Sequence, residues 1–350
     1  MSPSKELLDS IKITPLLDTL RLEKIDDEEY FSKKYSNYIS NSRLSLINPE
    51  QDNDPEAFFE GLSKHNKYSD ALIFGSAVHQ LSLQPELFEL STNVNRPTAK
   101  MGFIADELYN DFLNDTLTDE SIIAASDKIG YYKGKMNKDR IQAVRDACSD
   151  YWNSRKQNCN KIDSSTLIYL DPKSRERVTS CVRALDKNNR IQKLLCPEGI
   201  IETPISENEQ AILLDVQVDM PGVNPFILKL KAKLDNYTID KETNTIVVND
   251  VKTIGKILSY FEDNFEKFHY YRELAIYCWL LSLCAKKHYG MDRCTIKSNC
   301  LVVSTIPDFY TKVYEVTKKD FAKGFSEFTY LLKLVSYYVA TKYKDFAIWI

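Results

Sequence analysis

The stretch FILKLKAKLDNYTIDKETNTIVVNDVKT, residues 226–253, decides the fold. Apolar and polar residues alternate in its first and last thirds, which is typical of β-strands with one buried face. The polar segment IDKETN between them, residues 239–244, is typical of a turn. We therefore predict a β-hairpin.

Alternation also predicts which side chains of the hairpin lie together, because every second residue of a strand points to the same face. The first strand groups three lysines with one acid, namely Lys229, Lys231, Lys233 and Asp235. In the second strand, Asp250 and Lys252 share a face and Val251 points away. The hairpin thus presents two carboxylates and a lysine beside a basic strip.

The rest of the chain predicts helices around a small number of further strands. Residues 1–70 are interpreted as polar helices and connectors, with Ser40 or Ser42 as the N-cap of a short helix. Residues 71–103 contain an apolar helix with His79, and the charged residues 104–200 predict a helical insertion or cover. Strands are predicted at 211–218, 300–306 and 312–317, one long helix at 261–290 ending at Gly290, and a last helix at the C-terminus.

These elements predict an α/β protein with a mixed central β-sheet flanked by helices. The chain has 350 residues, 43% of them hydrophobic, which is enough for one large core. We interpret 1–350 as a single domain whose α/β core is 201–350. No apolar stretch is long enough to cross a membrane and the N-terminus does not resemble a secretory signal, so a cytoplasmic location is expected.

The cysteines and the net charge narrow the possible functions. Eight cysteines occur without a C-x-x-C pair, which favours reduced structural thiols over an iron–sulfur cluster. The net charge of −4 counts mildly against nucleic-acid binding, although metal-binding carboxylates can offset a local basic groove. Phosphate loops, dinucleotide-binding glycine motifs and serine-hydrolase elbows are absent from the sequence, which disfavours ATP-driven and NAD-linked functions.

The residue types of the hairpin suit phosphodiester hydrolysis. Asp235 and Asp250 offer the hard oxygen ligands that Mg²⁺ prefers, and the carbonyl of Val251 is a further possible ligand. Lys252 could orient or deprotonate the attacking water and stabilise the charge of the transition state. Acids and lysines at the edge of a hairpin are more often solvated surface, and the spacing by itself leaves that alternative open.

Several separated segments resemble the exonuclease VIII and lambda-exonuclease branch of the PD-(D/E)XK nuclease superfamily. They are YISNSRLSLI at 38–47, LIFGSAVHQLSLQPELF at 72–88, KLDNYTID at 233–240, TIVVNDVKT at 245–253, YYRELAIY at 270–277 and VTKKDFAKGFSEFTYLL at 316–332. Their order and spacing match the family over roughly residues 30–340. The resemblance implies a restriction-endonuclease-like core.

The resemblance also implies roles for individual residues. His79, Asp235 and Asp250 would bind one or two Mg²⁺ ions, with Mn²⁺ as a substitute, and Lys252 would be the catalytic lysine. The family's upstream glutamate corresponds best to Glu209, with Glu207 and Glu202 as alternatives.

On the helix after the hairpin, Tyr270 and Tyr277 fit the family pattern as DNA contacts. Glu273 stands where the family usually has glutamine. A glutamate would repel DNA phosphate, so Glu273 could instead bind metal or approach His79. The strip of Lys229, Lys231 and Lys233 is a second candidate DNA contact.

The implied function is 5′-to-3′ exonuclease activity on duplex DNA in phage or plasmid recombination, in the host cytoplasm if phage-encoded. A single-strand annealing protein and further copies of the chain are the implied partners besides DNA. Two alternatives remain open: an inactive DNA-binding or virion-associated protein with the same fold, and a structure-specific endonuclease.

Overall fold

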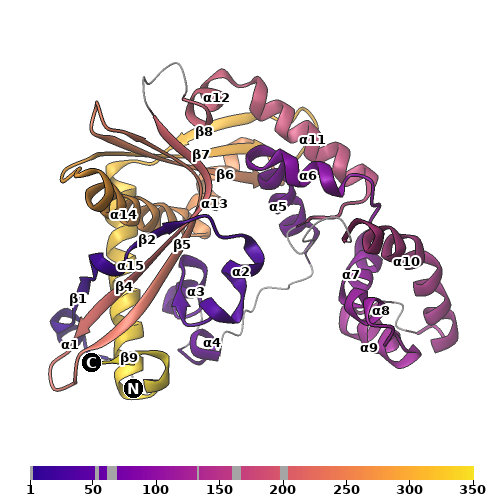
Figure 1. The fold of residues 1–350 in the computed structure, drawn as a ribbon, viewed down its shortest axis with the longest axis horizontal. Helices are drawn as coiled ribbons and strands as arrows, with labels where there is room; N and C mark the ends of the chain where they lie inside the picture. Colours follow the sequence, from indigo (N-terminus) through magenta and orange to yellow (C-terminus); the bar gives the residue numbers. More distant parts are fainter. Residues whose placement is uncertain (1–2, 52–54, 61–68, 132–133, 160–166, 198–203) are drawn as a thin grey trace. The chain divides into compact units, whose positions relative to one another are not determined.

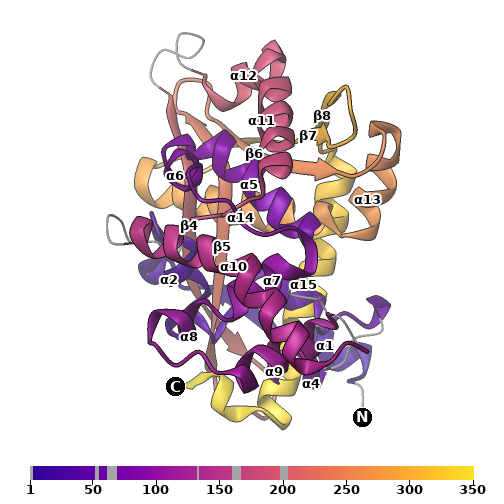
Figure 2. The ribbon, with the colours of Figure 1, turned by 90° about the vertical axis from the view of Figure 1, so that its right-hand side faces the viewer.

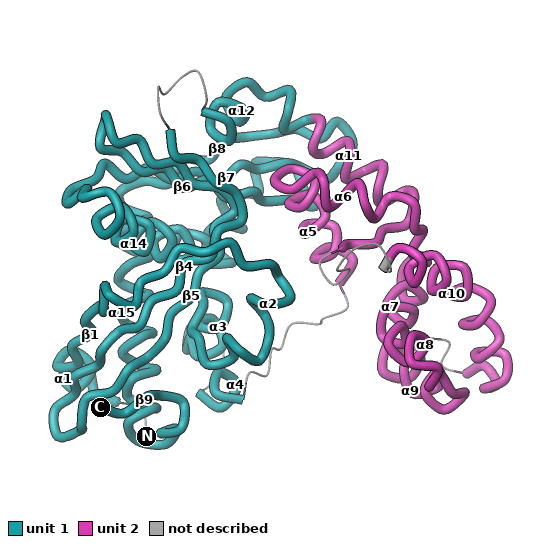
Figure 3. Tube along the Cα trace, viewed as in Figure 1, with its two compact units in different colours: residues 1–65, 184–350 teal, residues 66–183 magenta. Residues whose placement is uncertain are grey.

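The computed structural model describes residues 3–51, 55–60, 69–131, 134–159, 167–197 and 204–350. The chain divides into two compact units (Figure 3). The first consists of residues 1–65 and 184–350, and the second of residues 66–183.

A mixed β-sheet forms the centre of the first unit and confirms the predicted α/β class (Figure 1). Its strands lie in the order β1 (Lys12–Pro15), β4 (Ile205–Asp219), β5 (Phe226–Asp240), β6 (Thr245–Ile254), β7 (Thr295–Ser304) and β8 (Thr311–Glu315). Along this path only β6 and β7 run parallel. The short strands β2 (Arg21–Glu23), β3 (Tyr38–Ile39) and β9 (Ile348–Trp349) pair with β4 or β5.

The predicted hairpin is confirmed as β5 and β6, which pair antiparallel around a four-residue turn. Asp240 shapes this turn, because its Oδ1 accepts hydrogen bonds from the backbone N–H groups of Glu242 at 3.0 Å and Thr243 at 3.2 Å. Asn244 ends the turn in the left-handed region, with φ of 52°, which asparagine tolerates better than most residues.

The single long helix predicted for 261–290 is wrong in one respect, since the structure has two helices there. They are α13 (Phe261–Lys267) and α14 (Tyr270–Tyr289), preceded by the 3₁₀ turn η5 (Leu258–Tyr260). His269, with φ of 53°, breaks the helical path between them. The predicted end at Gly290 is correct, because this residue has φ of 68° and closes α14.

Helices cover both faces of the sheet. Helix α14 lies on one face (Figure 1), and α15 (Lys318–Thr341) packs against α14 so closely that a Cβ at Gly324 would lie 2.3 Å from the carbonyl oxygen of Tyr271. On the other face, α12 (Asn189–Leu195) accepts a hydrogen bond from Asn249 of β6 at its Leu194 carbonyl, 3.0 Å away. The C-terminal turn η6 (Lys344–Phe346) leads into β9.

The N-terminal segment contains more strand than was predicted. It has the helices α1 (Lys5–Ser10), α2 (Asp27–Phe31), α3 (Asn41–Ser45) and α4 (Pro55–Glu60), the 3₁₀ turns η1 (Leu17–Thr19), η2 (Lys33–Tyr35) and η3 (Pro49–Gln51), and also β1, β2 and β3. The interpretation as helices and connectors missed these strands, each of four residues or fewer, because such short strands hardly show alternation. Ser40 is confirmed as the N-cap of α3, where it accepts from the Arg43 N–H at 3.3 Å.

The second unit is helical. Its helices are α5 (Asp70–Leu83), α6 (Pro85–Ser91), α7 (Ala99–Glu107), α8 (Tyr109–Leu113), α9 (Asp119–Ile129), α10 (Asn137–Cys159) and most of α11 (Pro172–Lys187). Trp152 is buried in its core and donates to the carbonyl of Ala105 at 2.8 Å. The unit spans residues 66–183 and so combines the predicted helix with His79 with most of the helical segment predicted at 104–200. Across the described ranges, none of the helices combines the length and apolarity needed to span a membrane.

Candidate active site

The strands of the hairpin separate at the two predicted carboxylates. Pairing of β5 with β6 runs from the turn to Asn236 opposite Asn249 and ends there. Past this point β5 continues beside β4, while β6 continues beside β7 (Figure 1 and Figure 2). Asp235 and Asp250 occupy the first position beyond the last pair, so both lie at the fork between the strands.

Asp235 bridges the fork, because its Oδ2 accepts a hydrogen bond from the backbone N–H of Val251 at 2.7 Å. The side chain thus makes a link between β5 and β6 where their backbone pairing has stopped. Val251 itself is buried.

Glu209 of β4 lies beside Asp235. The neighbouring pairs, Asn208 with Asn236 and Gln210 with Leu234, place it opposite Asp235. The ligand oxygens of the two carboxylates lie within 4.8 Å of each other.

Glu209 has φ of 55°, a backbone conformation that costs a non-glycine residue on the order of 1–3 kcal/mol and is common at functional sites. The two alternatives for the upstream glutamate are placed differently: Glu207 is exposed, and Glu202 lies outside the described residues.

Lys252 lies between two carboxylates at the same fork. Its Nζ is 2.8 Å from Oδ2 of Asp250 and 3.1 Å from Oε2 of Glu273. Asp250 is almost fully buried, with 2% of its surface exposed, and Lys252 is mostly buried. The first unit therefore contains a compact, charged cluster built from β5, β6 and α14.

Burial and charge shift the pKa values of this cluster. Burial raises the pKa of Asp250 well above the usual range of a carboxyl group, and the nearby carboxylates of Asp235 and Glu273 add to this shift while Lys252 opposes it. Burial alone would lower the pKa of Lys252. The surrounding carboxylates outweigh that effect and raise the pKa of Lys252 well above its ordinary value. Lys252 is therefore held as an ammonium ion.

Helix α14 supplies the aromatic wall of the cluster. The Tyr277 hydroxyl donates to Oε1 of Glu273 at 3.1 Å, and the Lys252 ammonium group lies 4.7 Å from the centre of the Tyr270 ring. Glu273 and Tyr277 are one helical turn apart, and Tyr270 lies one turn before Glu273, so all three point the same way. The three predicted helix residues thus meet Lys252.

The predicted basic strip has partners inside the first unit. Lys231 is buried and donates to the backbone carbonyl of Tyr30 at 2.6 Å. Lys233 forms ion pairs with Asp27 and Glu209, and Lys229 lies 5.4 Å from the centre of the Tyr38 ring. DNA contact by these lysines stays a prediction.

His79 is half-buried on α5 of the second unit. Its predicted role as a metal ligand stays a prediction.

The carboxylates of the fork fit a divalent metal ion. Oδ2 of Asp250 is buried. Lys252 lies close to this oxygen, but none of the described residues forms a hydrogen bond of normal geometry with it. Asp235 and Glu209 add carboxylate oxygens within 4.8 Å of each other. Such hard oxygen ligands suit Mg²⁺ and Mn²⁺.

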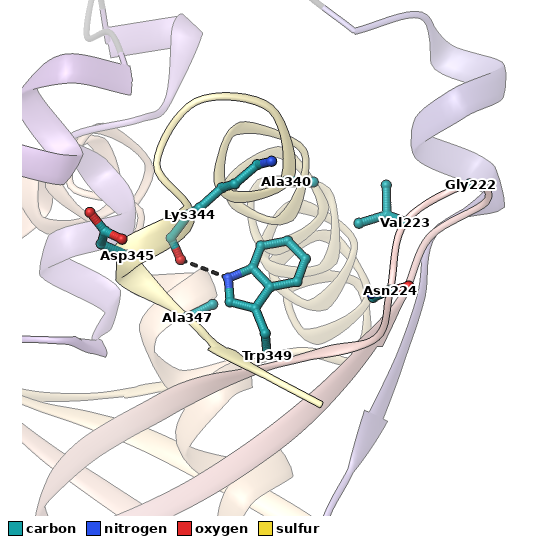
Figure 4. A pocket seen from close by; sticks show the side chains of 8 residues that line it. All are labelled: Gly222, Val223, Asn224, Ala340, Lys344, Asp345, Ala347 and Trp349. Carbon is teal, nitrogen blue, oxygen red and sulfur yellow. Dashed lines mark hydrogen bonds between the residues drawn. The ribbon is translucent and has the colours of Figure 1, made fainter.

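A separate cavity of about 840 Å³ lies near the C-terminus (Figure 4). Trp349 borders it and donates from Nε1 to the Lys344 carbonyl at 2.9 Å. The residues that line it are Gly222, Val223, Asn224, Ala340, Lys344, Asp345, Ala347 and Trp349. It contains none of the predicted site residues and offers no cluster of titratable groups comparable to the fork.

Comparisons with known proteins add little to this geometry. Neither a family model nor a curated protein matches the chain. Among solved structures, a candidate exonuclease from Eubacterium rectale has 11% sequence identity and a TM-score of 0.42, over 90% of this chain and 87% of that one. A Vibrio cholerae protein has 10% identity and a TM-score of 0.19, over 79% of this chain and 58% of its own. Likeness at this level does not decide function, which must be argued from the residues of the chain.

Proposed function

We propose that this protein is a metal-dependent nuclease that hydrolyses phosphodiester bonds in DNA. One observation carries the proposal: Asp235 and Asp250 lie where β5 and β6 separate, and Lys252 is 2.8 Å from Asp250. Two acids and a lysine of this kind provide what hydrolysis of a phosphodiester needs, namely oxygen ligands for a cation and a positive charge near the developing negative charge.

Each residue of the fork has a distinct proposed role. Asp235, Asp250 and Glu209 would hold one or two Mg²⁺ or Mn²⁺ ions, together with the Val251 carbonyl and His79. A bound divalent ion would polarise the phosphate and lower the pKa of an attacking water. Lys252, held protonated by its carboxylate neighbours, would stabilise charge in the transition state and not act as a base.

The finer parts of the proposal follow from the sequence resemblance. They are 5′-to-3′ exonuclease action on duplex DNA, a setting in phage or plasmid recombination, a cytoplasmic location, and association with an annealing protein or further copies of the chain. In the substrate complex Tyr270, Tyr277 and Lys229 are proposed DNA contacts. Glu273 is assigned to holding Lys252, which it contacts at 3.1 Å.

The experiment compares linear and covalently closed circular duplex DNA, with Mg²⁺, with Mn²⁺ and with chelator. Wild type is measured beside Lys252→Met and the control Lys256→Met, an exposed lysine of the loop after β6. We expect metal-dependent loss of linear DNA only, abolished by Lys252→Met and retained by the control. Cleavage of closed circles would indicate an endonuclease, and no cleavage with either metal would reject the nuclease proposal in favour of an inactive DNA-binding protein.

A further inference from the structure

Four asparagines form a row across the middle of the sheet. Asn208, Asn236, Asn249 and Asn299 come from β4, β5, β6 and β7, and each is paired in register with the next. Asn236 and Asn249 are fully buried, and Asn299 is 6% exposed. The mirrored pairs Asp235–Asn236 and Asn249–Asp250 are visible in the sequence, but only the register of the strands places the four asparagines side by side.

The side-chain amides of the row are hydrogen-bonded end to end. Asn299 donates to Asn249 at 2.9 Å, Asn249 to Asn236 at 2.9 Å, and Asn236 to Asn208 at 2.8 Å. Asn249 also donates to the Leu194 carbonyl of α12 at 3.0 Å. Asn249 therefore uses both N–H donors and its oxygen, as a buried amide must to offset its desolvation.

The row ends the paired part of the hairpin. Asn236 and Asn249 are the last pair of β5 and β6, and each is followed outward by a candidate metal ligand, Asp235 or Asp250. A slip of one residue between the strands would turn the aspartate of the slipped strand to the opposite face, away from the other aspartate. It would also leave buried amides unpaired, which costs about 1–3 kcal/mol for each group. The amide row thus penalises every register except the one that brings the two aspartates together.

We propose that Asn236 and Asn249 are positioning residues that fix the separation of Asp235 and Asp250 and thereby set the affinity of the fork for its divalent ion. This inference rests on the proposed function, because it assumes that the fork binds a metal. Groups that orient metal ligands typically contribute a factor of about 10–100 to metal affinity. In this protein the orienting groups act through the backbone of the ligands.

A purely structural role for the row would lower stability without changing metal affinity, so the test measures both. Asn249→Thr removes the amide and keeps a residue favoured in strands. The control is Thr238→Val on β5, which removes the hydrogen bond from the buried Thr238 to Ser206 at 3.3 Å. Thr238 lies two pairs closer to the turn than Asn236, on the same face of the sheet. Asn299→Thr is a milder variant, because it interrupts the row one strand away from the fork.

The measurement is Mn²⁺ binding by isothermal calorimetry on full-length protein without DNA, with thermal unfolding recorded in parallel. We expect Asn249→Thr to weaken Mn²⁺ binding roughly tenfold or more, Asn299→Thr to weaken it less, and Thr238→Val to leave it unchanged at a comparable loss of Tm. Unchanged Mn²⁺ affinity in both asparagine variants would overturn the inference. If Asn249→Thr does not fold, Asn299→Thr and the control decide the outcome.

Asp250→Asn separates this inference from the proposed function. If wild type binds Mn²⁺ and Asp250→Asn does not, the fork is a metal site and the asparagine variants test the positioning role by themselves. If wild type shows no Mn²⁺ binding that depends on Asp250, the proposed function fails and the positioning role fails with it.

Discussion

Glu273 is the residue at which this chain departs from the family it resembles, and the structure gives the departure a physical consequence. Its carboxylate lies 3.1 Å from Lys252 and accepts from Tyr277. A glutamine there could keep both contacts and would remove one negative charge from the fork. The glutamate therefore favours the charged state of Lys252, and under the proposed function its charge would oppose the binding of DNA phosphate.

We expect Glu273→Gln to bind duplex DNA several-fold more tightly than wild type. One like charge at about 4 Å is worth roughly 1 kcal/mol in a solvated setting. Fluorescence anisotropy in Ca²⁺, which should slow cleavage, measures the affinity. Glu242→Gln in the exposed hairpin turn controls for the change in net charge, and equal effects of the two substitutions would argue against a local role for Glu273.

Lys231 is a lysine of the predicted basic strip whose environment is that of a core residue. Burial, helped by the Arg43 charge, lowers the pKa of Lys231 to about 8. Between this value and the ordinary lysine value of 10.5, the unfolded chain binds more protons than the folded one. The free energy of unfolding therefore rises with pH across that window as far as Lys231 contributes.

Lys231→Met should remove this contribution. We expect the Tm of the variant to exceed that of wild type at pH 7, where the buried Lys231 of wild type is charged and its burial is unfavourable. By pH 10 the buried Lys231 is largely neutral in folded wild type, so the variant should lose this advantage. Thermal unfolding at both pH values provides the comparison. A constant difference in Tm between the two proteins would show that Lys231 does not titrate in this window.

At the scale of elements, Arg272 joins three helices that are far apart in sequence. It is fully buried on α14, and its guanidinium donates to Glu327 of α15 at 2.7 Å and to Asn41 and Ser45 of α3 at 2.7 and 2.6 Å. Despite the opposing effect of burial, hydrogen bonding from His269 and the charge of Arg272 lower the pKa of Glu327. The Arg272–Glu327 pair thus ties α14, the helix that carries Glu273, to α15.

Glu327→Ala should cost about 3–5 kcal/mol in the free energy of unfolding, because it leaves a buried guanidinium without its counter-charge. In wild type, the contribution of the ionised Glu327 carboxylate to the free energy of unfolding should disappear as the pH falls below the ordinary glutamate pKa of 4.5, because the carboxyl group becomes protonated. The control is Glu266→Ala, which breaks an exposed ion pair with Lys323 and should cost at most about 1 kcal/mol. Urea unfolding measures both, and similar costs would contradict the account of Arg272.

Some elements could be predicted from the sequence and others could not, for physical reasons. The hairpin follows from alternation and a polar turn, and the end of α14 follows from Gly290. The break at His269 has no proline or glycine to mark it. It accompanies contacts with α15, such as the approach of the His269 Nδ1 to the Glu327 carboxylate at 2.9 Å. Strands β1, β2 and β3 depend on pairing with β4 and β5 and are too short to show a pattern of their own.

At the scale of the whole molecule, the sequence brings the candidate site together from separated segments. Asp235, Asp250, Lys252 and Glu209 were all named from sequence, and the fold of the first unit places them at one fork. The asparagine row and the Lys252–Glu273 contact depend on register and helix packing, which a single sequence does not reveal. His79 belongs to the second unit, and its role awaits experiment.

Under the proposed function, the carboxylates of the fork hold the divalent ion that drives cleavage of DNA. Single-turnover cleavage of linear duplex DNA in Mg²⁺ by Asp250→Asn, compared with Asp215→Asn, tests it most directly. Asp215 is a half-buried carboxyl on β4, outside the fork. We expect Asp250→Asn to slow cleavage by roughly 10³-fold, about 4 kcal/mol, and Asp215→Asn to cleave at nearly the wild-type rate. Cleavage by Asp250→Asn at the rate of the control would contradict the account.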